Sequence, residues 1–157
     1  MKTIKWLGAV ILAIALQGCS TLPTPEEMQV AVKNFKLPKY PAKGKSMVYV
    51  VRPSIIGTAV RFNVFLDDQK DSSEMGYNRG GQYIYFNVAP GKHTIQSKAE
   101  NWAECSINPK AGEIIFIQQD PSIGVIMARN SINTIDELTG KYRVKNATLG
   151  TIIKLDK

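Results

Sequence analysis

Apolar and polar positions over residues 46–157 form short runs separated by turn residues. Residues 47–51 are continuously apolar, which is typical of a strand buried on both faces. Residues 60–67 alternate with a period of two, which is typical of a strand with one buried face. Residues rich in β-formers also fill 82–88, 93–99, 103–108, 113–119 and 123–129. About seven or eight short strands, roughly ten residues apart, predict a mainly β protein folded as an antiparallel β-sandwich.

Helical signals flank these strands. Residues 131–138 favour one or two helical turns that end at Gly140, and residues 142–144 and 151–153 favour short edge strands. Before the sandwich, Thr24-Pro25-Glu26-Glu27 has the form of a capping box and predicts a short helix over about residues 25–35. The Lys/Pro-rich segment that follows, to Lys45, is predicted to be an extended, solvated tether, with a basic patch against lipid head groups as the alternative.

The N-terminus has the layout of a secretory signal peptide. Two lysines precede an uncharged apolar run over residues 6–16, which is well short of the ~20 residues of a membrane-spanning helix. The next residues, Leu16-Gln17-Gly18-Cys19, resemble the bacterial lipobox. This resemblance implies that Cys19 is lipidated and becomes the first mature residue, and that Ser20 after it directs the protein to the outer membrane. The expected parts are a lipoprotein signal peptide, a lipidated N-terminus with helix and linker, and a β-sandwich domain, over residues 1–18, 19–45 and 46–157.

Charge narrows the classes of partner. The 157-residue chain carries a formal net charge of +7. Removal of the two signal-peptide lysines leaves about +5, which suits anionic phospholipid or an acidic cell-wall polymer. A secreted protein with this modest balance is not expected to bind nucleic acid.

The second cysteine, Cys105, has no intramolecular partner if Cys19 is lipidated. It alternates with Ile107 on one face of its predicted strand, and free cysteine behaves as a small buried hydrophobe. We therefore expect a packed, inert thiol. The alternative is a disulfide to another chain.

Four segments carry a resemblance to a known family: Val48–Pro53, Phe62–Asp68, Tyr83–Thr94 and Ala111–Ile117. They resemble an uncharacterised group of bacterial lipoproteins with a PEGA-like β-sandwich domain of unknown function, and the Pro-Gly-Lys-His-Thr turn at 90–94 is the most specific part. The second segment departs from the family pattern, because Asp67-Asp68-Gln69 stands where an Asp-Gly turn is usual. The resemblance implies a β-sandwich and an envelope location, but no reaction, cofactor or partner.

Candidate chemistry is sparse. His93 is the only histidine, so a multi-histidine metal site is excluded, and no motif supplies a nucleophile and an orienting acid around it. A structural hydrogen bond at the start of a strand is therefore the preferred role for His93. The cluster Asp67, Asp68 and Asp71 is interpreted as a solvated turn rather than a Ca²⁺ site, because it lacks the glycine and distal glutamate of an EF-hand. No catalytic residue, metal ligand or cofactor is predicted.

The candidate binding surface is aromatic. Phe65, Tyr83 and Tyr85 alternate with the inward positions of their strands, so we expect an exposed aromatic strip that stacks on sugars or docks a partner. The leading hypothesis is a non-enzymatic binding or scaffolding module, anchored to the outer membrane through Cys19 and facing the periplasm. Its expected partner is an envelope protein or a cell-wall glycan. The alternative is a hydrolase-like envelope enzyme that uses His93 with Cys105 or an aspartate.

Overall fold

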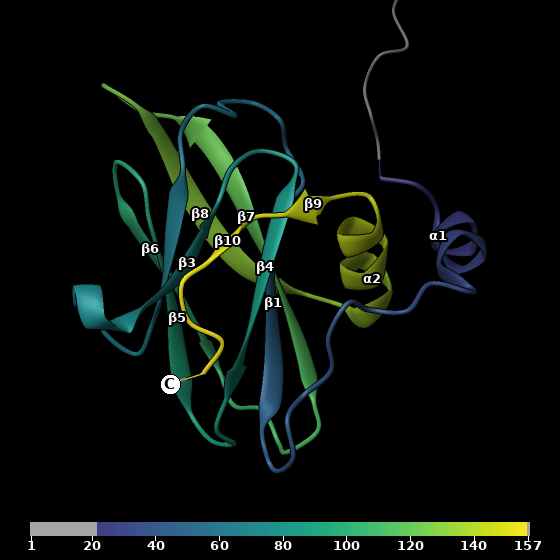
Figure 1. Ribbon diagram of the computed structural model, residues 1–157. Helices are drawn as coiled ribbons and strands as arrows, with labels where there is room; N and C mark the ends of the chain where they lie inside the picture. The colour runs from purple at the N-terminus through teal and green to yellow at the C-terminus, as the bar shows by residue number, and fades with distance from the viewer. Residues whose placement is uncertain (1–21, 157) are drawn as a thin grey trace, which may run out of the picture.

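The computed structural model describes residues 22–156 and confirms the mainly β prediction (Figure 1). Ten strands of this range form two five-stranded sheets. The first sheet has the order β8-β7-β1-β4-β9, with bounds Ala128–Ile135, Ile114–Ile123, Ser46–Arg52, Gln82–Val88 and Thr148–Leu149. The second has the order β10-β3-β2-β5-β6, with bounds Thr151–Ile152, Glu74–Asn78, Phe62–Leu66, His93–Lys98 and Trp102–Ile107. The sequence prediction had no strand where β3 and β9 lie, and the strand expected at 123–129 is wrong, because residues 124–127 form the turn between β7 and β8.

Strand β1 is the centre of the first sheet, and every residue of it is buried. It pairs antiparallel with β4 and parallel with β7, so the sandwich is dominated by antiparallel pairs without being purely antiparallel. One face of β1 contributes Val48 and Val50 to the main core between the sheets, together with Ile84, Phe86 and Ile95. The continuous apolar run arises because the other face is also covered, as a buried central strand requires.

A second apolar cluster covers that outer face. Tyr49 lies at its centre, with its ring 5.5 Å from the ring of Phe116. The remaining buried members are Leu37, Met47, Val51, Tyr83 and Val144. Helix α2 (Glu137–Lys145) supplies Val144, so the first sheet has a helix on its outer side (Figure 1).

The region around α2 differs from the sequence prediction. The expected helix at 131–138 is wrong, because β8 continues to Ile135 and pairs with β7. The expected edge strand at 142–144 is also wrong, because α2 spans it. Asp136 is the N-cap of α2 and accepts a hydrogen bond from the Thr139 amide at 2.9 Å. Gly140 lies inside the helix rather than after it, and a Cβ at this position would stand 2.2 Å from Cγ of Phe116.

The segment before the sandwich is folded onto it. Helix α1 (Pro25–Val32) has the expected capping box, although it ends three residues before the predicted limit. The prediction of a solvated tether is wrong, because Leu37 is buried and the Tyr49 hydroxyl bonds both the amide and the carbonyl of Lys39, at 2.9 and 2.7 Å. The Ala42 amide also donates to Oδ1 of Asn87 at 3.0 Å. These contacts hold the N-terminal segment against the first sheet.

Membrane-spanning helices are absent between residues 22 and 156, where neither helix has the required length and apolar character. The signal-peptide prediction and Cys19 lie outside the described residues.

Candidate functional site

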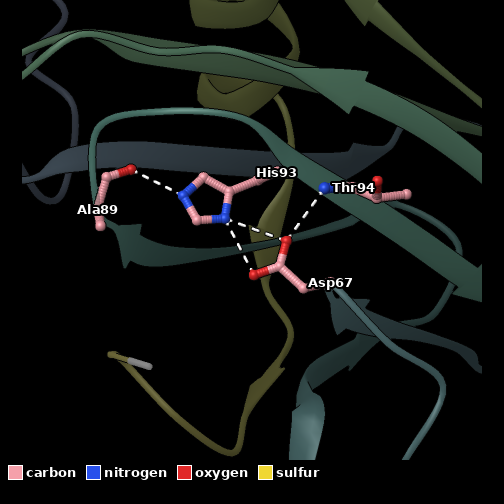
Figure 2. Close-up of polar contacts among 4 residues, drawn as sticks. All are labelled: Asp67, Ala89, His93 and Thr94. Atoms are coloured by element: carbon pink, nitrogen blue, oxygen red, sulfur yellow. Dashed lines mark hydrogen bonds and ion pairs between the residues drawn. The ribbon is translucent and has the colours of Figure 1, made fainter.

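Asp67 and His93 meet at one end of the sandwich, although 26 residues separate them (Figure 2). Asp67 directly follows β2, and His93 is the first residue of the neighbouring antiparallel strand β5. The pairing of these two strands brings the two residues together. Nδ1 of His93 lies 3.0 Å from Oδ2 and 3.1 Å from Oδ1 of Asp67. Oδ1 of Asp67 also accepts the Thr94 amide at 3.1 Å, while the Asp67 amide donates to the Thr94 carbonyl at 2.8 Å.

The second ring nitrogen of His93 faces another acceptor. Nε2 lies 2.9 Å from the carbonyl oxygen of Ala89, at the start of the turn that connects β4 to β5 (Figure 2). Gly91 in that turn has φ +123°, the positive value that the Pro-Gly sequence predicts. A carboxylate and a carbonyl both accept hydrogen bonds, so each ring nitrogen of His93 faces an acceptor. In this arrangement the His93 side chain fastens the turn to Asp67.

An open cleft of about 480 Å³ lies beside this pair. Besides Asp67, His93 and Thr94 it is lined by Lys92, Ser106, Ile107 and Asn108. The lining combines the Lys92 cation with hydroxyl and amide groups and the apolar side chain of Ile107, and the Asp67 carboxylate is already paired. Lys92, Ser106 and Asn108 can meet a polar or acidic group of a partner.

Cys105 does not join this site. It packs against the main core, as the sequence predicted, and burial raises the pKa of its thiol to about 11. At neutral pH the group is therefore a protonated thiol rather than a nucleophilic thiolate. The polar contacts of His93 in the described structure are those to Asp67 and Ala89. Of the two pairings named in the enzyme alternative, His93 with Cys105 is therefore not formed, whereas His93 with an aspartate is formed through Asp67.

The three aspartates of the acidic cluster do not converge. Asp67 pairs with His93, Asp68 accepts the Lys70 amide at 3.0 Å, and Asp71 begins a 3₁₀ turn (Asp71–Ser73). Within residues 22–156 no group of three or more histidine, cysteine, aspartate or glutamate side chains is arranged to hold a metal ion.

The expected aromatic strip is wrong. Phe65 lies in the second sheet, whereas Tyr83 and Tyr85 lie in the first. Phe65 lies on the face of β2 away from the core residues Val64 and Leu66, and it is buried there with its ring 5.1 Å from that of Trp102. Tyr83 is buried and Tyr85 half-buried, because both join the cluster under α2. These residues hold the fold rather than present a surface.

Sequence reasoning missed Arg52, which organises the opposite end of the sandwich. Its side chain is fully buried at the end of β1, with the guanidinium 3.8 Å from the centre of the Phe62 ring. Nη1 donates to the carbonyl of Val60 at 2.6 Å, and Nη2 donates to those of Ile56 and Gly57 at 2.9 and 3.0 Å. The sequence contained one signal for this role, an arginine at the end of an apolar strand. Burial without a carboxylate partner lowers its pKa.

Glu100 has a similar role at the same end. Its carboxylate accepts the amides of Val125, Ile126 and Met127 at 3.0, 2.9 and 2.8 Å. These bonds hold the pKa of Glu100 below its usual value. No sequence spacing indicates this contact, because the partners lie 25–27 residues away.

A two-layer sandwich with an open cleft beside a His–Asp pair defines a class of β-domain proteins rather than an activity. Residues 42–131 match the model of a protein family of unknown function, DUF2846, and because the match covers more than half of the chain, the protein belongs to this family. It is also similar to an uncharacterised protein of Haemophilus influenzae, with 27% identity over 141 residues that cover 88% of this chain and 79% of the relative. Membership of an uncharacterised family is thereby confirmed, while its PEGA-like and lipoprotein character stays a prediction.

Proposed function

We propose that this protein is a lipid-anchored, non-enzymatic binding module of the bacterial envelope, held on the outer membrane with its domain in the periplasm. The order of basic, apolar and small residues before Cys19 supports the anchor. Several acyl chains on one cysteine would exceed the marginal binding that a single chain gives. The polar cleft beside His93 supports the binding role, because the ring nitrogens fasten the site and leave Lys92, Ser106 and Asn108 to meet a partner.

The strongest structural support for this proposal is that the N-terminal segment packs against the first sheet. Three peptide steps separate Cys19 from Leu22, and they span at most about 11 Å. Because the segment from α1 to β1 is fixed to the first sheet, an anchored Cys19 holds the whole sandwich at the membrane surface instead of on a long tether. The domain then binds its partner, an envelope protein or a cell-wall glycan, at a defined distance from the bilayer.

The anchor is tested by expressing the full chain in a bacterium. We expect the wild-type protein to enter the detergent phase on phase separation, with an acylated mature N-terminus at Cys19 by mass spectrometry. Cys19→Ala should remain in the aqueous phase, whereas the control Cys105→Ala should behave as wild type. A mature chain that begins elsewhere, or a wild-type protein in the aqueous phase, would contradict the anchor.

The binding role is tested with photo-crosslinkers in intact cells at Lys92 and Asn108. We expect both positions to crosslink to the same protein or glycan, and an equivalent probe at the exposed Val30 of α1 should not. Equal crosslinking at all three positions would contradict a binding site at the cleft. A purified protein that hydrolyses an envelope substrate and loses that activity in His93→Gln would instead establish the enzyme alternative.

A further inference from the structure

Six large apolar side chains are exposed at the end of the sandwich opposite the His93 cleft. They belong to the β1–β2 loop (53–61) and to the tip of the β7–β8 hairpin. Their exposed fractions are Ile55 76%, Ile56 73%, Ile123 97%, Val125 91%, Ile126 88% and Met127 52%. Ile56 lines one shallow hollow together with residues 121–128, so the two loops lie side by side. We call these six residues the apolar tip.

The backbone of the apolar tip is held by hydrogen bonds to the side chains of Glu100 and Arg52. Glu100 accepts three consecutive amides of the hairpin, and Arg52 donates to the carbonyls of Ile56 and Gly57 in the loop. The apolar side chains therefore extend from a backbone in which three hairpin amides and two loop carbonyls already have partners within the protein. An apolar medium requires this arrangement, because unsatisfied backbone groups are costly there.

Three arginines lie close in sequence or by contact to the two loops of the apolar tip. Arg61 and Arg129 are exposed beside the loop and the hairpin, and the Arg79 side chain donates to the carbonyl of Ala59 in the loop. The Glu100 carboxylate at this end accepts hydrogen bonds from the hairpin amides. Apolar side chains with arginines beside them complement a bilayer of anionic phospholipid. The apolar side chains can enter among the acyl chains, while the arginines bind the phosphates.

The proposed anchor lies toward the same end. In Figure 1 the β7–β8 hairpin lies at the upper left and the first described residues at the upper right, whereas the turn before β5 lies at the bottom. With Cys19 within about 11 Å of Leu22, lipid at Cys19 brings this end of the sandwich to the membrane.

We propose that the apolar tip inserts into the membrane interface as a second contact beside the lipid, with Arg61, Arg79 and Arg129 at the phosphate level. The occupant is a phospholipid surface, and the proposal rests on the lipid anchor of the proposed function. Two contacts fix the orientation of the sandwich, so the His93 cleft faces away from the bilayer.

The test places an environment-sensitive fluorophore at either end of β7. The full chain carries Cys105→Ser with Ile126→Cys at the tip, or with Ala111→Cys in the exposed turn before β7 as the matched control. The ten residues of β7 separate the two probes by roughly 33 Å. Protein from cells is reconstituted into phosphatidylethanolamine–phosphatidylglycerol vesicles, and quenching by nitroxides on the acyl chains is measured.

We expect the probe at 126 to shift its emission to the blue and to be quenched several-fold more than the probe at 111. A probe at 126 that stays in water while the protein floats with the vesicles would overturn insertion and leave the anchor intact. A protein that does not float with the vesicles would refute the lipid anchor. In that case, titration with excess vesicles would test insertion through the blue shift of the probe at 126. A shift that disappears when the protein is diluted at constant lipid would show a second copy at the tip and overturn the proposal.

Discussion

Replacing Arg52 by lysine should destabilise the protein by about 3 kcal/mol. The guanidinium reaches carbonyls on two sides, Val60 through Nη1 and Ile56 and Gly57 through Nη2, and its plane lies over Phe62. A lysine keeps the buried charge but offers one compact donor on a different stem, which cannot occupy both sides. One or two charged hydrogen bonds are lost at about 1.5–3 kcal/mol each, and the stacking contact is lost with them.

Urea unfolding of Arg52→Lys measures this loss, and hydrogen exchange locates it. We expect a lower unfolding midpoint with an unchanged slope, and faster exchange of amides in the 53–61 loop. The exposed Arg129 supplies the control, because Arg129→Lys should change the unfolding free energy by less than about 0.5 kcal/mol. If Arg52→Lys matched that control, the view that Arg52 holds the loop would be refuted.

Three further predictions concern Gly140, Cys105 and Glu100. Gly140→Ala should lower the unfolding free energy by about 1–2 kcal/mol in urea, since crowding of Phe116 outweighs the ~1 kcal/mol gain in helix propensity, and a stabilised variant would contradict this packing. With its pKa at about 11 instead of 9.0, Cys105 should react with iodoacetamide at pH 8 about a hundredfold more slowly than an ordinary thiol, and faster as pH rises or after unfolding; rapid labelling of the folded protein would oppose burial. Because the folded pKa of Glu100 lies below 4.5, its carboxylate stabilises the hairpin above that pH, and this stabilisation is lost as the pH falls through the lowered pKa. The protection of amides 125–127 from hydrogen exchange should fall over the same pH range, and it should also fall in Glu100→Gln at neutral pH. Unchanged protection would exclude the Glu100 contact as the cause of order in the hairpin.

Local patterns predicted those elements that depend on neighbours in sequence. The capping box of α1 and the positive φ of Gly91 involve groups a few residues apart, and both are confirmed. Helix α2 could not be predicted in this way, since few apolar residues mark a helical face over 137–145. It forms where Gly140 lets it approach Phe116 and where Val144 enters the outer cluster.

The candidate surface failed for a related reason. Alternation correctly places Tyr83 and Tyr85 on the face of β4 away from the main core, but it does not reveal that a helix covers that face. Likewise, the lysines of the linker suggested a solvated tether, whereas Leu37 anchors it. The contact between Asp67 and His93 depends on the pairing of β2 with β5, which no spacing along the chain encodes.

The short strands β9 and β10 each cover one edge of a sheet. Thr148–Leu149 extends the first sheet beside β4, and Thr151–Ile152 extends the second beside β3, with Gly150 between them. Without these residues β3 and β4 would be unprotected edges, open to pairing with foreign strands. A chain that stopped before residue 148 would therefore be prone to aggregation, because the native pairing of these two edges requires residues 148–152.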